Sequence, residues 1–279
     1  MCEREQEIDL IEAFKEIITD NIRFFYSILD LAAVNQKRMY KSSDLGWLWS
    51  FVKPLLYLCV FYVAISIGFK HAKDVQGIIC PYFIWLVSGM VPWFYMRSMI
   101  VGGAGCFKKF KALITRSFYP ASIFPTTVAF SFLYVHAGMV VVCIILCVCF
   151  GVYPSIYWLQ IPIYTLFMVL LSIIWNTGAG VLSVISGDFM DLLKAVNPAF
   201  FWLSGILFNS RGQDVVSDLF FQLNPITYIV EGYRNAFCYH QWLWEDMESF
   251  GYFMLVLGVM ICVSLWLYKK LRKSLPDIL

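Results

Sequence analysis

The chain has 279 residues, of which 60% are hydrophobic, 18% aromatic and only 14% charged, and its mean hydropathy is +0.71. In soluble domains about a quarter of the residues are charged, so this composition excludes a soluble protein and indicates an integral membrane protein. The net charge of +2 identifies no partner, and we expect no nucleic acid among the partners.

Residues 8–31 have the pattern of an amphipathic helix that is too charged to span a membrane. Apolar residues recur at spacings of three and four, with charged residues between them. The apolar positions are Ile11, Phe14, Ile18, Ile22, Phe25 and Leu29. This helix either packs on the protein or lies in the membrane interface, and we favour the interface. We expect residues 1–44 to form a cytoplasmic amphipathic region, without a signal peptide, ahead of a single membrane domain at 45–279.

The first membrane span follows a polar patch at Lys41 to Asp44. From Leu45 to Phe69 the chain is almost wholly apolar, which is long enough to cross about 30 Å of hydrocarbon as a helix. Five more apolar runs follow at about 78–100, 123–150, 156–184, 192–208 and 250–268. The fifth run is short and interrupted by Asn197-Pro198. The sequence therefore predicts an all-α membrane protein with six spans.

Lysine and arginine are unequally distributed between the two sides of these six runs. One side carries three clusters of cations, and the other side carries only scattered ones. The clusters are Lys37, Arg38 and Lys41; Lys108, Lys109, Lys111 and Arg116; and Lys269, Lys270, Arg272 and Lys273. Because cytoplasmic loops are enriched in lysine and arginine, this asymmetry places both termini in the cytoplasm.

The cytoplasmic segment 105–125 predicts a short amphipathic helix that lies flat on the membrane face. Phe107, Phe110, Leu113 and Ile114 fall at helical spacing, with basic residues between them. Two interpretations stay open: an anchor beside anionic lipid, or a coupling helix that docks into a partner protein.

The outer segment 209–249 contains two short apolar arms, 219–223 and 226–237, joined at Asn224-Pro225. The arms are too short to span and too apolar for a solvated loop, so we predict a re-entrant helical pair that acts as an outer gate. Asn224 is expected to cap the second arm and Pro225 to be its first helical residue. Glu231 and Arg234, three apart, either pair with each other or serve the gate.

Aromatic residues give this outer mouth a second possible role. They form either an interfacial belt or a surface on which sugar rings stack. These residues are Tyr228, Tyr233, Tyr239, Trp242 and Trp244.

Several kinds of chemistry are missing from the sequence. No G-x-x-x-x-G-K-[ST] motif occurs, so we expect no ATP hydrolysis by that route. The three histidines are far apart, which argues against a metal site or a triad, and His136 is predicted to be a packed side chain. The spacing of the nine cysteines supports neither a zinc site nor a disulfide framework. Asp188 and Asp191 are interpreted as solvated caps rather than as a proton relay.

The first span carries a motif that resembles the permeases of ABC (ATP-binding cassette) polysaccharide exporters. The motif consists of Tyr40, Ser42, Ser43, Leu45, Gly46, Trp49 and Pro54. The likeness extends over essentially the whole chain. The segment that resembles the family's ATPase-coupling helix contains Phe110, Leu113, Ile114, Arg116 and Phe118. The segment that resembles its outer Asn-Pro…Tyr-Arg region contains Asn224, Pro225, Tyr228, Glu231, Tyr233 and Arg234. Gly187 and Gly205 depart from the family pattern, in which arginine and proline are common at these positions.

The resemblance implies a permease subunit that exports a lipid-linked O antigen, capsule or teichoic acid polymer across a bacterial cell membrane. It implies a working unit of two permease copies and two nucleotide-binding ATPase subunits. ATP and Mg would be used by the ATPase subunits, with no cofactor bound by this chain. Spans one and five would line the path of the glycan. Membrane lipids would surround the protein. The alternatives are a drug or small-molecule efflux permease and, more distantly, a membrane-embedded glycosyl- or phosphotransferase.

Overall fold

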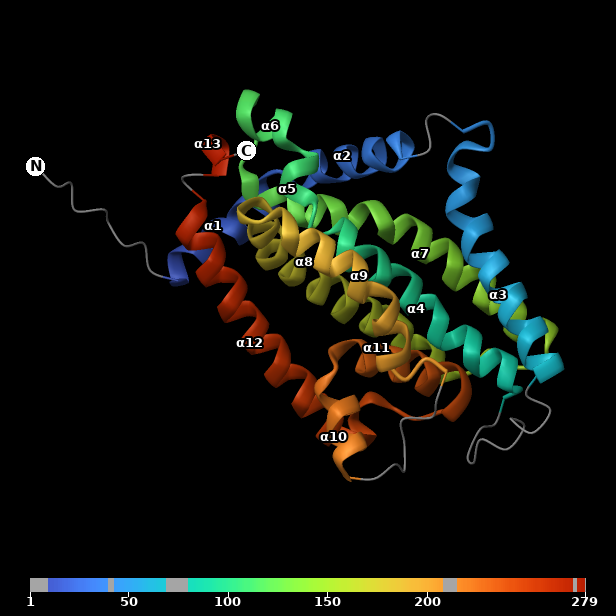
Figure 1. Cartoon of the computed structure of the whole chain (residues 1–279). Helices are drawn as coiled ribbons and strands as arrows, with labels where there is room; N and C mark the ends of the chain where they lie inside the picture. Colours follow the sequence, from blue (N-terminus) through green and yellow to red (C-terminus); the bar gives the residue numbers. More distant parts are fainter. Residues whose placement is uncertain (1–9, 40–42, 69–79, 208–214, 273–274, 279) are drawn as a thin grey trace, which may run out of the picture.

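The computed structural model describes residues 10–39, 43–68, 80–207, 215–272 and 275–278. All regular structure in these residues is helical, which confirms the all-α prediction (Figure 1). The long helices are α3 (Trp49–Gly68), α4 (Tyr82–Gly102), α7 (Phe124–Cys149), α8 (Ile161–Ile185), α9 (Gly187–Leu203) and α12 (Met247–Leu271). The shorter helices are α1 (Leu10–Arg23), α2 (Phe25–Arg38), α5 (Cys106–Lys109), α6 (Lys111–Arg116), α10 (Val215–Leu223), α11 (Pro225–Arg234) and α13 (Leu275–Ile278).

Five helical segments of the described chain are long and apolar enough to cross a membrane. They are Gly46–Ala64, Tyr82–Gly102, Ala121–Cys149, Ile156–Ile185 and Met247–Leu271. These segments confirm five of the predicted spans. The remaining prediction, 192–208, falls largely on α9, which has only 17 residues and contains Pro198. A sixth span therefore stays a prediction.

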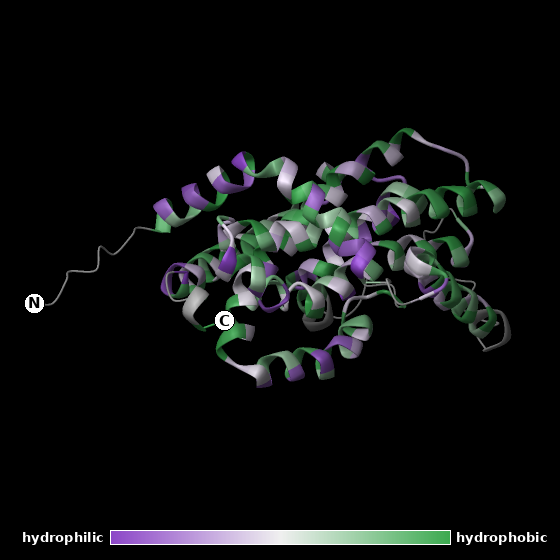
Figure 2. Cartoon of the chain, turned by 90° about the horizontal axis from the view of Figure 1, so that it is seen from above, coloured by the Kyte–Doolittle hydropathy of each residue, from purple (hydrophilic) through white to green (hydrophobic). Residues whose placement is uncertain are grey.

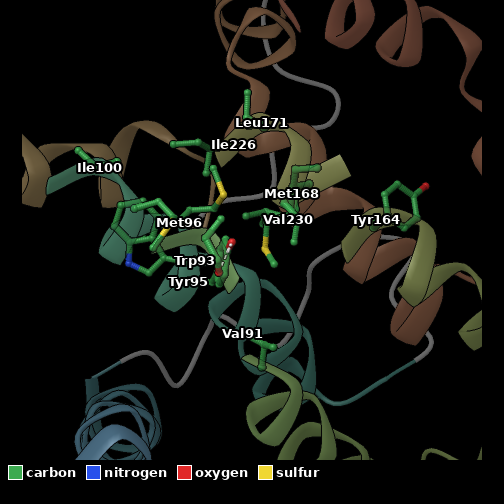
Figure 3. Packing of buried hydrophobic residues seen from close by; sticks show 14 of the residues in the cluster. Val91, Trp93, Tyr95, Met96, Ile100, Tyr164, Met168, Leu171, Ile226 and Val230 are labelled. Carbon is green, nitrogen blue, oxygen red and sulfur yellow. Dashed lines mark hydrogen bonds between the residues drawn. The ribbon is translucent and has the colours of Figure 1, made fainter. Parts of the chain in front are cut away.

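The core of the bundle is built around α4. In the most apolar 18-residue stretch of α4, 78% of the residues are buried inside the protein. In the corresponding stretch of the first span, only 11% are buried. Figure 3 shows Trp93 and Met96 of α4 beside Met168 of α8 and Val230 of α11. The first span thus lies at the edge of the bundle, and little of the chain covers it.

The predicted helix at 8–31 is in fact two helices that meet at Phe24. The helical hydrogen bonds continue through this residue, from Phe24 N–H to the Asp20 carbonyl and from Ile28 N–H to the Phe24 carbonyl. The chain therefore bends at Phe24 while its i to i−4 hydrogen bonds are kept. The Phe24 ring packs edge-on against Tyr119, at 5.8 Å between ring centroids, and α2 then follows α7.

The apolar stripe of α1 is exposed, whereas α2 buries one face against the bundle. Ile11, Phe14, Ile18 and Ile22 are all exposed. Figure 2 shows hydrophobic and hydrophilic turns alternating along the helix next to the N-terminus. Because the chain itself leaves this stripe uncovered, the structure favours α1 at the membrane interface, although that location stays a prediction.

The two ends of the described chain lie at the same end of the bundle. In Figure 1, α1, α5, α6 and α13 gather there, and α10 and α11 lie at the opposite end. Helix α13 contacts α6, and an ion pair joins Glu16 of α1 to Arg272 beyond α12. This arrangement agrees with termini on one side of the membrane; the assignment of that side to the cytoplasm stays a prediction.

Candidate functional site

The outer segment forms the two predicted short helices, α10 and α11, which meet at Asn224. Its Oδ1 accepts a hydrogen bond from the Ile226 N–H at 3.0 Å, and Pro225 occupies the first turn, so both predictions for this turn are confirmed. The Asn224 Nδ2 also donates to the Leu203 carbonyl at 3.0 Å and to the Ser204 Oγ at 3.2 Å. The start of α11 is therefore fastened to the end of α9.

Arg234, the last residue of α11, is completely buried. Its Nη1 donates to the Glu231 carboxylate at 2.6 Å and to the Gly205 carbonyl at 2.9 Å, and its Nη2 donates to the Ile206 carbonyl at 2.6 Å. The guanidinium carbon lies 3.5 Å from the centre of the Trp85 ring. The predicted Glu231–Arg234 pair is confirmed, and hydrogen bonds and a cation–π contact compensate the buried charge.

Two glycines surround this arginine, one by leaving space and the other through its carbonyl. A Cβ on Gly89 of α4 would lie 2.9 Å from the Arg234 Nη2. Gly205, whose carbonyl accepts from Arg234, has a left-handed φ of 64°, a conformation that glycine adopts without steric cost. The left-handed backbone and the hydrogen bond to Arg234 therefore explain why glycine occupies position 205.

Tyr233 connects α11 to two helices of the core. Its hydroxyl lies 2.7 Å from the His136 Nε2 of α7 and 2.6 Å from the Thr165 Oγ1 of α8. Tyr228 stacks on Phe253 of α12 at 4.5 Å between ring centroids. His136 is packed, as predicted. The residues predicted to form an outer gate thus hold α11 inside the bundle; the gating itself stays a prediction.

The aromatic residues beyond α11 form stacked pairs. The rings of Trp242 and Trp244 are parallel within 8°, with centroids 4.6 Å apart, and Tyr157 stacks on His240 at 5.2 Å. Trp244 is exposed. Both interpretations of this outer cluster, an interfacial belt and a surface for sugar rings, stay open.

The expectation that the cysteines form no disulfide was wrong for one pair. Cys80, just before α4, and Cys238, in the π-helical turn after α11, are joined by a disulfide, with their Cα atoms 5.2 Å apart. They are 158 residues apart in sequence, so no local spacing could reveal the pair. Disulfides persist in oxidising compartments, which agrees with the predicted outer location of this end.

The predicted coupling helix is divided into α5 and α6, with the break at Phe110. The Phe110 ring stacks on Phe124 at 4.9 Å, and Phe110 and Ile114 are buried within the chain. Leu113 also packs partly against the core, whereas Phe118 is fully exposed and Arg116 is exposed. Most of the apolar face that was expected to meet a partner is therefore covered by this chain, and Phe118 is the large apolar group left outside.

The first-span motif is partly visible in the structure. Tyr40 and Ser42 lie outside the described residues. Gly46 has a φ of 51°, and its N–H donates to the Ser43 carbonyl at 2.9 Å, which turns the chain into the span. Leu45 is exposed beside this turn. Trp49 and Pro54 line a cleft between α3 and its neighbouring helices.

A cleft of about 350 Å³ lies among α2, α3, α4, α7 and α9. Lys53 of α3 and Arg97 of α4 both line it. Arg97 was not predicted from the sequence. An arginine inside an apolar span is itself the signal that could have revealed it, because such charges are costly in a membrane and mark functional positions.

Other candidate chemistry is sparse in the described part of the chain. There, no group of three or more histidine, cysteine or acidic side chains is placed to hold a metal ion. Asp191 pairs with Lys194 at 2.8 Å, and both side chains are exposed. The hydrogen bond from Lys194 lowers the pKa of Asp191 below its ordinary value. This exposed pair agrees with the solvated interpretation of Asp191.

Comparisons with known proteins place the chain in a family. Residues 27–238 match the family described as ABC-2 type transporter. An O-antigen export system permease protein RfbA from Klebsiella pneumoniae is 26% identical, over 93% of this chain and 97% of the relative. A second RfbA from that organism is 25% identical over the same shares, and one from Myxococcus xanthus is 20% identical over 88% of this chain and 91% of its own length. These matches confirm the resemblance to exporter permeases, and the chain belongs to the ABC-2 type transporter family.

Proposed function

We propose that this protein is the membrane-spanning permease subunit of an exporter that moves a lipid-linked polysaccharide from the cytoplasmic to the outer face of a bacterial cell membrane. O antigen, capsule and teichoic acid are the polymer classes to which the resemblance points. ATP would be hydrolysed by a separate subunit. The observation that carries the proposal is the similarity to O-antigen export permeases along nearly the whole chain.

The architecture supports a transport role. Five helices are suited to crossing a membrane. The edge helix α3 has many exposed apolar side chains, among them Leu56, Val60 and Val63. A surface of this kind needs lipid or another protein against it. We propose that a second copy of the permease faces α3 across the transport path.

The export role is tested by deleting the gene and measuring polysaccharide on the cell surface. We expect surface polymer to disappear and to return when the wild-type gene is restored, with lipid-linked polymer accumulating inside. If surface polymer is unchanged and sensitivity to small toxic molecules rises instead, the protein is an efflux permease and the proposal is wrong.

Docking of the ATPase subunit is tested at Phe118. We propose that this side chain inserts into the partner, since it is the apolar group of the coupling segment that is fully exposed. Losing a large apolar contact costs about 2–5 kcal/mol. Phe118→Asp should therefore abolish co-purification of the ATPase while the permease stays inserted. The matched control is Tyr153→Asp, which changes an exposed aromatic residue between α7 and α8. Equal retention of the ATPase by both variants would refute docking at Phe118.

A further inference from the structure

An apolar groove of about 700 Å³ lies on the side of the bundle away from α3. Its lining residues come from α1 and α2 and from the spans α7, α8 and α12. None of its described lining residues belongs to α3, and α12 and α3 lie on opposite sides of the bundle in Figure 1. The groove is therefore separate from the edge at which we propose the transport path.

Helix α1 is fastened to the bundle at two places beside this groove. The Asp20 carboxylate accepts a hydrogen bond from the Ser122 hydroxyl, and the Asn21 Nδ2 donates to the Ser122 carbonyl at 3.4 Å. One turn earlier, Glu16 forms an ion pair with Arg272 beyond α12. These polar contacts hold α1 against the spans, and its apolar side chains contribute to the wall of the groove.

The lining of the groove is almost entirely hydrocarbon. Phe14, Ile18 and Ile22 of α1 line it and are still exposed. Two hydroxyls in the wall, those of Thr177 and Ser264, already donate to helix carbonyls. An apolar surface of this size needs a hydrophobic occupant. Because the groove lies among three helices that are suited to crossing a membrane, lipid rather than water reaches it.

The length of the groove is close to the depth of one leaflet. Along α8 its lining extends from Leu170 to Thr177, and along α12 from Leu257 to Leu265. At 1.5 Å per residue these stretches are roughly 10–12 Å long, compared with about 15 Å for half of the hydrocarbon core. Both stretches begin near the middle of their helices and continue toward the end of the bundle at which α1 lies. The groove thus fits one straight acyl chain that enters from the leaflet next to α1.

These dimensions favour a phospholipid over two other hydrophobic occupants. A spanning helix of another protein would need an apolar surface about 30 Å long, which is more than twice the length of the groove. A polyprenyl carrier chain is longer than one leaflet is deep, and the transport path proposed for it lies along α3. The volume of about 700 Å³ is within the range of about 300–1,000 Å³ that is usual for ligand sites.

We propose that this groove binds one acyl chain of a glycerophospholipid from the leaflet next to α1, and that the bound chain completes the packing of α1 on the spans. The proposal rests on the membrane location of the chain and not on the polymer that is exported. It therefore goes beyond the proposed function and is tested without an export assay.

The site is tested by photo-crosslinking of the purified complex of permease and ATPase in phospholipid nanodiscs. The probe is phosphatidylcholine that carries a diazirine midway along one acyl chain, and mass spectrometry identifies the labelled residues. Leu166 and Leu170 are both exposed on α8, one turn apart, but only Leu170 lines the groove. We expect about tenfold more label at Leu170 than at Leu166, which corresponds to a preference of about 1.4 kcal/mol for the groove.

A pair of matched variants then blocks the groove or leaves it open. Leu170→Trp places a large ring in the groove and should reduce the labelling of the α12 wall, at Leu257 and Leu265, by about tenfold. Leu166→Trp adds the same ring one turn away, outside the groove, and should leave this labelling unchanged. The labelling of the wild type judges the site even if a tryptophan variant fails to fold.

Four results would overturn the site. Equal labelling of Leu166 and Leu170 in the wild type would indicate ordinary lipid around the bundle, and no label in the groove would indicate that protein covers it. Undiminished labelling of the α12 wall in Leu170→Trp would exclude the groove as the binding place. Loss of the label when an equal amount of undecaprenyl phosphate is added would make the groove a site for the carrier lipid.

Discussion

Replacing Arg234 by methionine should destabilise the outer end of the bundle more than any exposed substitution. Methionine fills a similar space but donates no hydrogen bond. The carbonyls of Gly205 and Ile206 would then lose donors that lie 2.9 and 2.6 Å away, and Glu231 would lose its ion pair with Arg234. Removing one partner of a buried ion pair costs about 3–5 kcal/mol. For a chain of this size, such a loss lowers the thermal unfolding midpoint by roughly 6–20 °C.

The midpoint is measured on purified protein in detergent, by size-exclusion chromatography after heating. Arg23→Met is the matched control, because Arg23 also lies near a ring, that of Phe24, but is exposed. We expect it to change stability by no more than about 0.5 kcal/mol. Adding Glu231→Gln to Arg234→Met should recover part of the loss, since it removes the charge that Arg234 balances in the wild type.

Equal midpoints for Arg234→Met and Arg23→Met would refute this reasoning. They would mean that the outer segment contributes little to the stability of the bundle and that the buried arginine is not an anchor.

Three further predictions concern other fixed points of the fold. Gly46→Ala should cost about 1–2 kcal/mol, because alanine disfavours the left-handed φ of 51° although its Cβ would meet no atom within 4 Å; thermal unfolding measures this loss. Asn224→Ala should cost about 1–2 kcal/mol of stability and speed proteolysis at 219–226. Asn224→Asp keeps the cap but not the hydrogen bond to Leu203, so it should lose less stability. Equal losses of stability in the two variants would contradict the role of the cap. In a variant that retains only Cys80 and Cys238 of the nine cysteines, both should resist alkylation until a reductant is added, and a mass shift on gels reports this; immediate alkylation of the unfolded, unreduced variant would exclude the disulfide.

Local patterns in the sequence were sufficient to predict the local features of the fold. Long apolar runs predict five helices that the structure confirms, since length and composition alone decide whether a helix can span a membrane. The Asn224 cap and the Glu231–Arg234 pair depend on residues two and three positions apart, so their spacing is enough to identify them.

Features that depend on tertiary packing could not be predicted in this way. The helix break at Phe110 brings its ring onto Phe124 of another helix, and a periodic pattern gives no sign of such a contact. The neighbours of Arg97 belong to a different span, and the partner of Cys80 lies 158 residues away. In these cases the residue type was informative, but its partner was fixed by the packing of the helices.

The disulfide between Cys80 and Cys238 has a mechanical consequence for transport. Together with the contact of Arg234 with the Trp85 ring, the disulfide joins α11 to α4. Helix α11 therefore cannot move independently of α4. We expect α4 and α11 to move as one rigid block whenever the outer side opens. In the proposed pair of permeases, each copy would contribute one such block. The two blocks would then slide apart along the sparsely covered α3, and no segment within either copy would need to unfold.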